Sequence, residues 1–388
     1  MKISISVKGR FHAFFLANEL QKAGLLNQLI TPYPVFKTCE YGIDKTFVDS
    51  LLLNELVERG IRQLPFQFVK TDRANYLFNK LFDMRAGRKI KTNSDIFVGW
   101  SEGCLETMKK IRGRPIKLIV ENGSTHAIFQ KEIMEEEFEL HGLSFQADKR
   151  MISKKLEEYS FADYISIPSQ FTKNTFLKYP ALKNKIICIP YGVDAEKFYP
   201  IKNATNDKIF RIIICGNIGL RKGIQYLLKA FYELKLPNSE LYVIGPVSAE
   251  LKSIIEKYKA SNIIWAGCFN ENKLVHEYAK GSVFCLPSIE EGLALVIPQA
   301  MSCGLPIICT TNTGGGDIIS EGEEGFIIPI RDADAIKQKI LFLYENAETR
   351  IEMGKQARNT ILNNFTWSHY GQKIIAAYRD ILKSSSAP

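Results

Sequence analysis

The sequence predicts an α/β protein made of two doubly wound domains that face each other across a cleft. Its 388 residues exceed the roughly 100–200 residues of a single domain, so two domains are expected. Short apolar runs alternate with helix-length segments almost from end to end, which favours parallel sheets covered by helices. A polar stretch without periodicity, residues 200–208, separates two such series. Doubly wound domains bind ligands beyond the carboxyl ends of their strands, so the cleft is the expected site.

The first series is expected to form an N-terminal domain over residues 1–200. It opens with a strand at Ile3–Val7, followed by a helix over Phe11–Lys22 whose apolar residues recur at helical spacing. The pattern is weakest between residues 30 and 95. Further strands are expected at Asp95–Gly99, Lys117–Val120, Tyr164–Ile167 and Lys185–Ile189.

The second series is expected to form a C-terminal domain over residues 208–366. After it, residues 367–388 contain a helical pattern over Trp367–Leu382, which we expect to pack back on the N-terminal domain. The strands of the second domain are expected at Phe210–Cys215, Leu241–Ile244, Ile263–Trp265, Val283–Leu286, Pro306–Cys309 and Gly325–Ile328.

The net charge of +9 lies almost entirely in the N-terminal half. Residues 1–190 hold 29 Lys and Arg against 21 Asp and Glu, whereas residues 191–388 hold 22 against 21. A one-sided basic surface favours nucleic acid, anionic lipid or an anionic substrate as the partner. Lysines scattered for solubility would give the same count.

The clustering of the basic residues in one segment favours anionic lipid as the partner. Residues 59–117 hold 14 Lys and Arg against five acids, a composition typical of an interfacial surface when aromatic side chains accompany it. The alternative is that some of these aromatic side chains belong to the core. The interleaved aromatic residues are Phe66, Phe68, Tyr76, Phe78 and Phe82.

The compartment expected from the sequence is the cytoplasm. The eight cysteines form no CxxC pair, and Cys188, Cys215 and Cys285 lie in apolar runs, as buried thiols in a reducing environment do. No run reaches about 18 uninterrupted apolar residues, and the first apolar strand is too short for a signal-peptide core. Any membrane contact is therefore expected to be peripheral, on the inner face of the cell membrane.

The segment Cys215–Phe231 (CGNIGLRKGIQYLLKAF) predicts a phosphate site. A strand ends at Cys215, a glycine-rich turn with Asn217 follows, and a helix begins after Gly223. Backbone amides at such a turn favour an anion, and Arg221 and Lys222 add two positive charges. The segment is neither a Walker loop nor a GxGxxG fingerprint. The alternative is a surface turn with two solvated cations.

The segment Pro287–Ile319 predicts a second ligand-binding element. A strand ends in the carboxylates Glu290 and Glu291, and we expect Gly292 to open a helix that carries Gln299 eight residues after Glu291. The amides of residues 292–295 would then lie at a positive helix terminus suited to a phosphate. Three glycines at 314–316 form a further turn where backbone can approach a ligand. Solvated surface acids are the alternative.

These segments resemble the family-4 retaining glycosyltransferases. Residues 288–309 are similar to the family's E-x7-E signature, EGxGLxxxEAMACGxPV, with Glu291 at its first glutamate and Gln299 in place of its second. GLRKG resembles its phosphate-binding Arg and Lys, and TNTGGGDII its glycine-rich turn, with Asp317 where Glu is common. Residues 161–198 resemble its interdomain segment. The likeness is firm over about residues 161–370 and looser before that.

The resemblance implies the GT-B fold, with two Rossmann-like domains across a cleft. In the N-terminal half, Gly9 is similar to a family glycine that touches the diphosphate, and His126 to a histidine that reaches the donor sugar and acceptor. A structural histidine is the alternative for His126. Residues 135–137, three glutamates in a row, are expected to form only a solvated helix face.

The activity implied is transfer of a sugar from a nucleoside diphosphate, with retention and without a required metal ion or cofactor. UDP and glucose are the leading expectations, and a glycan or lipid-linked glycan the expected acceptor. Glu291 would hold sugar hydroxyls, Gln299 the ribose, and the leaving phosphate would take the acceptor proton. The implied catalytic residues are Glu291, His126, Lys222 and Arg221, and the implied donor-binding residues are Gly9, Asn217, Arg221, Lys222, Glu291, Gly292, Leu293, Ala294, Leu295 and Gln299.

Other functions remain open at this point. A GT-B epimerase, a phosphorylase, or a weakly active nucleotide-binding partner subunit would carry similar segments, and the replacement at Gln299 keeps the last of these in view. A nicotinamide oxidoreductase is not supported, because neither half has the glycine fingerprint followed by an acid. We expect no nucleic-acid partner.

Overall fold

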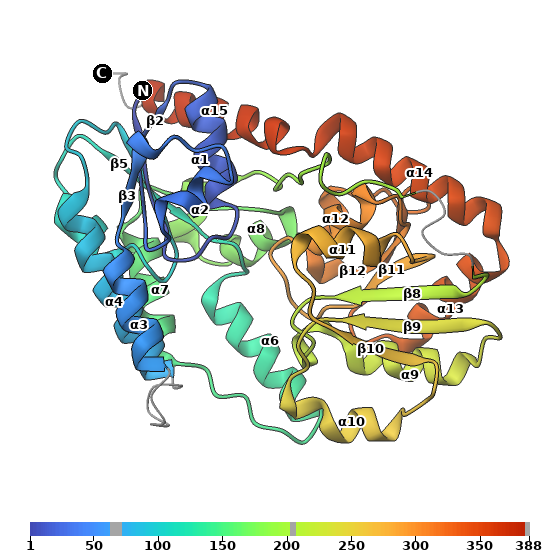
Figure 1. Cartoon of the computed structure of the whole chain (residues 1–388). Helices are drawn as coiled ribbons and strands as arrows, with labels where there is room; N and C mark the ends of the chain where they lie inside the picture. The colour runs from blue at the N-terminus through green and yellow to red at the C-terminus, as the bar shows by residue number, and fades with distance from the viewer. Residues whose placement is uncertain (63–71, 202–206, 385–388) are drawn as a thin grey trace.

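A computed structural model describes residues 1–62, 72–201 and 207–384. Within these residues the chain forms two parallel sheets, one of seven strands and one of six, each flanked by helices (Figure 1). The predicted fold class, two doubly wound domains in the GT-B arrangement, is confirmed. The aromatic positions Phe66 and Phe68 lie outside the described residues.

The N-terminal sheet has the order β3-β2-β1-β4-β5-β6-β7. Its central strands are apolar and buried on both faces, as in β1, where Ile5 lies opposite Leu29 of β2 and Val98 of β4. The strands are β1 (Ile3–Ser6), β2 (Leu26–Thr31), β3 (Val48–Ser50), β4 (Ile96–Trp100), β5 (Lys117–Glu121), β6 (Tyr164–Ile167) and β7 (Ile186–Cys188). Every predicted strand of this half is present, whereas β2 and β3 were not predicted.

The C-terminal sheet has the order β10-β9-β8-β11-β12-β13. Its six described strands correspond to the six that the sequence predicts. They are β8 (Phe210–Cys215), β9 (Ser239–Ile244), β10 (Ile263–Gly267), β11 (Val283–Leu286), β12 (Ile307–Thr310) and β13 (Gly325–Ile328).

Fifteen α-helices are described between and after these strands. Among the described helices, none is long and apolar enough to span a bilayer. In the N-terminal half they are α1 (Ala13–Lys22), α2 (Val35–Cys39), α3 (Leu52–Arg62), α4 (Asp72–Lys89), α5 (Leu105–Ile111), α6 (Ala127–Leu140), α7 (Lys149–Phe161) and α8 (Gln170–Leu177). The rest are α9 (Ile224–Leu234), α10 (Lys252–Lys257), α11 (Glu271–Tyr278), α12 (Val296–Ser302), α13 (Ala333–Glu345), α14 (Ala347–Asn364) and α15 (Trp367–Ser384).

The C-terminal helix α15 returns from the second domain to the first and lies along α1 (Figure 1). The ring of Trp367 stacks on the ring of Phe15 with centroids 4.4 Å apart and planes 9° from parallel. Gly371 permits close approach, because a Cβ there would lie 2.7 Å from Cβ of Glu19. The chain therefore crosses between the domains twice.

Helix α6 belongs to the N-terminal half in sequence but packs against the C-terminal domain. Its Glu137 was expected on a solvated face, and this expectation is wrong. The carboxylate is fully buried and accepts hydrogen bonds from Gln225 Nε2 at 2.7 Å, Tyr226 OH at 2.9 Å and Arg331 Nε at 2.7 Å. These three partners come from the C-terminal domain, so distant residues rather than water satisfy this acid.

Candidate active site

A cleft of about 890 Å³ opens between the two domains. Its C-terminal wall is built by the loops after β8, β9 and β10, and its N-terminal wall by α6, α7 and the loop after β4. Glu102, Gln130, Lys131 and Lys155 line the N-terminal wall, and Gly216, Asn217, Arg221, Lys222, Gly245 and Phe269 line the other. The carboxyl ends of parallel strands thus meet at one opening, as the fold predicts.

Glycines let backbone line the floor of this cleft directly after β8. Gly216 has a left-handed φ of 139°, and a Cβ there would lie 2.9 Å from Cε of Lys222. Gly245, after β9, approaches so closely that a Cβ would lie 1.8 Å from the Gly216 carbonyl oxygen. A side chain at Gly216 would therefore collide with Lys222, and one at Gly245 would collide with the Gly216 backbone.

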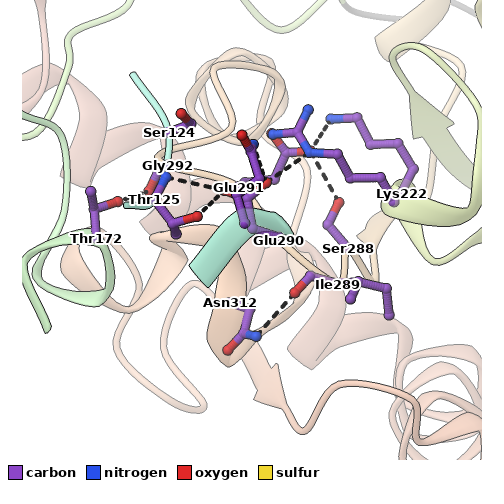
Figure 2. Close-up of polar contacts among 12 residues, drawn as sticks. Ser124, Thr125, Thr172, Lys222, Ser288, Ile289, Glu290, Glu291, Gly292 and Asn312 are labelled. Atoms are coloured by element: carbon purple, nitrogen blue, oxygen red, sulfur yellow. Dashed lines mark hydrogen bonds and ion pairs between the residues drawn. The ribbon is translucent and has the colours of Figure 1, made fainter. Parts of the chain in front are cut away.

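Arg221 and Lys222 converge on the carboxylate of Glu291, and Figure 2 labels Lys222 and Glu291. Lys222 Nζ lies 2.7 Å from Glu291 Oε1, and Arg221 Nη2 donates to Glu291 Oε2 at 3.1 Å. Burial opposes the charge on Arg221, yet the carboxylates of Glu291 and Glu290 raise its pKa above the usual value. The structure therefore brings these three residues together, and the carboxylates of Glu290 and Glu291 balance the two positive charges.

Glu290 has a different role from its neighbour. Its carboxylate is fully buried and accepts from Thr125 Oγ1 at 2.6 Å, Thr125 N at 3.1 Å, Gln130 Nε2 at 2.9 Å and Arg221 Nε at 2.9 Å. Burial favours the neutral acid, but Arg221 and the bonds from Thr125 and Gln130 lower the pKa of Glu290. Thr125 and Gln130 belong to the N-terminal half, so Glu290 joins the two domains.

The segment from Gly292 to Leu295 is not the start of a helix, which corrects the sequence prediction. Helix α12 begins at Val296, and the Ala294 amide donates to the Thr313 carbonyl at 3.2 Å rather than pointing at a ligand. The Gly292 carbonyl accepts from Ser169 Oγ at 2.6 Å. This segment packs closely on the turn at Gly314, because a Cβ on Gly314 would lie 2.4 Å from the Gly292 oxygen.

Gln299 faces a second cavity, of about 480 Å³, which Arg10, Phe11, Glu271 and Leu295 also line. Tyr278 OH donates to Gln299 Oε1 at 3.4 Å. Arg10 forms an ion pair with Glu271, which Lys197 also contacts at 2.7 Å. The cavity therefore brings together residues from both domains and from the segment that links them.

Gly9 lies directly under an aromatic ring. A Cβ at Gly9 would lie 2.3 Å from the ring of Phe11, whose own φ is 40° and whose side chain is exposed. A larger side chain at Gly9 would therefore displace the exposed ring of Phe11. Gly9 itself lines neither of the two cavities described above.

His126 lies in an aromatic cluster, away from the cleft lining. Its Nδ1 accepts from the Ile128 amide at 3.3 Å, which caps α6, and its ring stacks on Tyr179 with centroids 3.8 Å apart. Burial, with a contribution from Lys155, lowers the pKa of His126 to about 4. A neutral, capping histidine is the structural alternative named above, and the geometry favours it over contact with a donor sugar.

Residues 196–360 match the family model described as glycosyl transferases group 1. Over these residues the chain is therefore similar to the group 1 glycosyl transferases. A sulfoquinovosyl transferase of Arabidopsis thaliana is 34% identical over 43% of the chain and 34% of the relative. An uncharacterized glycosyltransferase of Methanocaldococcus jannaschii is 28% identical over 71% of the chain and 70% of the relative. The alignment with the Arabidopsis protein thus spans about a third of that relative's length.

Solved structures share the fold of the chain over nearly its whole length. A sucrose-phosphate synthase from Thermosynechococcus elongatus has a TM-score of 0.77 at 16% identity, covering 99% of this chain and 100% of that one. Anabaena HepE, solved in complex with UDP-glucose, has a TM-score of 0.70 at 14% identity, covering 98% and 100%. At these identities the likeness establishes the GT-B fold.

Proposed function

We propose that the protein is a retaining, family-4 glycosyltransferase that transfers glucose from UDP to a hydroxyl of a glycan or lipid-linked glycan. The observation that carries the proposal is that Arg221 and Lys222, which line the cleft, converge on Glu291. The complex of HepE with UDP-glucose supports UDP and glucose as the first donor to test. The basic N-terminal half is consistent with an acceptor on an anionic membrane.

In this proposal Arg221 and Lys222 stabilise the leaving diphosphate, so no metal ion is required. Preorganised cations in a cleft are already oriented when charge develops, and removing one such group typically costs about a hundredfold or more in rate. Their present partner, Glu291, would exchange contacts with them for hydroxyls of the donor sugar. Asn217 and the backbone at Gly216 would contact the phosphates, and Gln299 the ribose.

Donor turnover with and without an acceptor tests this function against its alternatives. A transferase releases UDP from UDP-glucose faster when an acceptor is added. An epimerase consumes the donor without an acceptor, and a phosphorylase requires phosphate. A partner subunit binds the nucleotide without turnover. The proposal fails if no nucleotide sugar is turned over faster in the presence of any glycan acceptor.

Peripheral membrane binding is the second part of the proposal. Helix α3 exposes Leu53 and Leu56, with 71% and 54% of each residue accessible, and α4 ends in Arg88 and Lys89. Apolar side chains beside basic ones suit the interface of an anionic bilayer. The aromatic residues expected there are less available, since Phe82 is buried in the core.

A further inference from the structure

Glu102, in the loop after β4, has a strained backbone at the edge of the cleft. Its φ is 75°, in the left-handed region that residues other than glycine, Asn and Asp rarely adopt. Strained residues of this kind persist where surrounding structure overdetermines them, and they concentrate at functional sites. The main chain and the side chain of Glu102 each have partners that account for this conformation.

Two buried charged side chains of α7 hold this backbone. The Glu102 amide donates to Glu158 Oε2 at 2.8 Å, and the Glu102 carbonyl accepts from Lys154 Nζ at 2.8 Å. Glu158 is fully buried and Lys154 nearly so. Burying charge is costly unless it is paired and hydrogen-bonded, and here the bonds go to the main chain of one loop. The left-handed turn is thus fixed by long-range contacts.

This turn directs the Glu102 side chain toward the cleft. Its Oε1 lies 3.3 Å from Nζ of Lys155, and 42% of the Glu102 side chain is accessible. Both residues line the N-terminal wall, across the cleft from Arg221 and Lys222. Met151 and Ile152 line the same wall and add apolar surface beside the pair.

We propose that Glu102 and Lys155 bind a hydroxyl of a neutral sugar acceptor and determine which acceptor is used. One hydroxyl can donate to the carboxylate of Glu102 while it accepts from the ammonium of Lys155, and a C–H face of the sugar can pack on Met151 and Ile152. The inference rests on the proposed glycosyl transfer and names the acceptor side of the same cleft. Glu102 acts here as a binding residue and takes no proton from the acceptor.

The strain at Glu102 supplies a test that separates binding from folding. Glycine adopts a positive φ without strain, so Glu102→Gly relieves the backbone while it removes the carboxylate. A residue kept for folding would be expected to lower the melting temperature when it is lost. Loss of the ion pair with the nearly buried Lys155 opposes the gain from the relieved backbone, so Glu102→Gly is expected to melt close to the wild-type temperature.

The experiment uses UDP-glucose as donor and four neutral p-nitrophenyl glycosides, with gluco-, galacto-, manno- and xylo-configured rings, as acceptor probes. For the best probe, Glu102→Gln and Glu102→Gly are expected to raise the acceptor KM by about tenfold or more, the loss of a charge-assisted hydrogen bond. Because Glu102 is proposed to contact the acceptor, the acceptor KM should rise by a larger factor than the donor KM. Glu157→Gln is the matched control, because Glu157 lies on α7, which also carries Lys155, and its ion pair with Lys109 is exposed.

Failure of the proposed function and failure of the Glu102 assignment give different results. If wild type neither binds nor hydrolyses UDP-glucose and other nucleotide sugars, the proposed function itself fails. If wild type transfers sugar but Glu102→Gln keeps the wild-type acceptor KM, or if none of the neutral probes is used, the assignment of Glu102 is overturned.

Discussion

The carboxylate of Glu290 and the hydroxyl of Thr125 lie 2.6 Å apart although 165 residues separate them in the chain. Thr125 stands at the carboxyl end of the β5 segment, and Glu290 at the end of the β11 segment. The contact therefore fixes the two walls of the cleft relative to each other at the level of Arg221 and Lys222. A group that joins the domains at this point contributes to stability as well as to the site.

Replacing Glu290 with Gln should lower the free energy of unfolding by about 1–3 kcal/mol, because a buried, charge-assisted network loses its charge. The pKa of Glu290 is lowered in the folded protein, so its contribution is present above the ordinary carboxyl pKa and is lost as pH falls through the folded value. Urea unfolding at neutral pH measures the loss. Glu256→Gln, at an exposed pair, is the control, and equal stabilities for both variants would refute the assignment.

The lowered pKa of His126, in the N-terminal half, predicts that the free energy of unfolding depends on pH. Burial lowers this pKa to about 4 from 6.5, so the stabilising effect of His126 is fully present above pH 6.5 and is lost as pH falls toward 4. The linked loss is about 3 kcal/mol. His126→Asn keeps a good N-cap and should flatten this decline. Urea unfolding at pH 7, 5.5 and 4.5 measures it, with exposed His276→Asn as control. Identical pH profiles for wild type and His126→Asn would contradict the prediction.

Gln299→Glu should tighten binding of UDP by roughly three- to thirtyfold, about 0.6–2 kcal/mol, since a carboxylate accepts from two ribose hydroxyls with charge assistance. The catalytic step should change little. Glu271 shares the cavity, but its contacts with Arg10 and Lys197 limit repulsion. Calorimetry with UDP compares the affinities of the variant and wild type. Unchanged or weaker affinity would mean that Gln299 does not face the ribose, or that the amide is itself the adapted group.

Membrane binding predicts that the protein sediments with liposomes containing anionic lipid and much less with neutral ones. Leu53→Asp combined with Leu56→Asp should abolish the difference, because it places charge on the exposed face of α3. Leu362→Asp is a matched control, since Leu362 is an exposed apolar residue on α14. Negligible binding to both liposome types by wild type would rule out the surface.

Local sequence pattern was sufficient where a strand is an apolar, β-branched run. FRIIIC and VFCL are such runs, and both became buried strands, β8 and β11. It was insufficient for β2, whose Gln28 is polar yet fully enclosed. The side chain of Gln28 is satisfied by Asp49 Oδ2 and the Lys89 carbonyl, partners that a local window cannot contain.

The site residues also fall into two groups, those that the local sequence identified and those that it did not. Arg221, Lys222 and Glu291 could be grouped from sequence because each follows directly after a strand that ends at the same edge of one sheet. Glu102 was missed, since its loop carries no motif and only its φ and its contact with Lys155 single it out. Glu137 was misjudged because its partners lie in the other domain, as far as 194 residues away.

The most direct test of the account is the rate of UDP release from UDP-glucose, with a saturating acceptor, in wild type, Lys222→Ala and Glu291→Ala. Each variant should lose on the order of a hundredfold or more in kcat, since a preorganised charge at the diphosphate or sugar is removed. Both variants should remain folded at the assay temperature, and Lys259→Ala, at an exposed lysine, should match wild type. Near-wild-type turnover in both Lys222→Ala and Glu291→Ala would contradict the assignment of the active site.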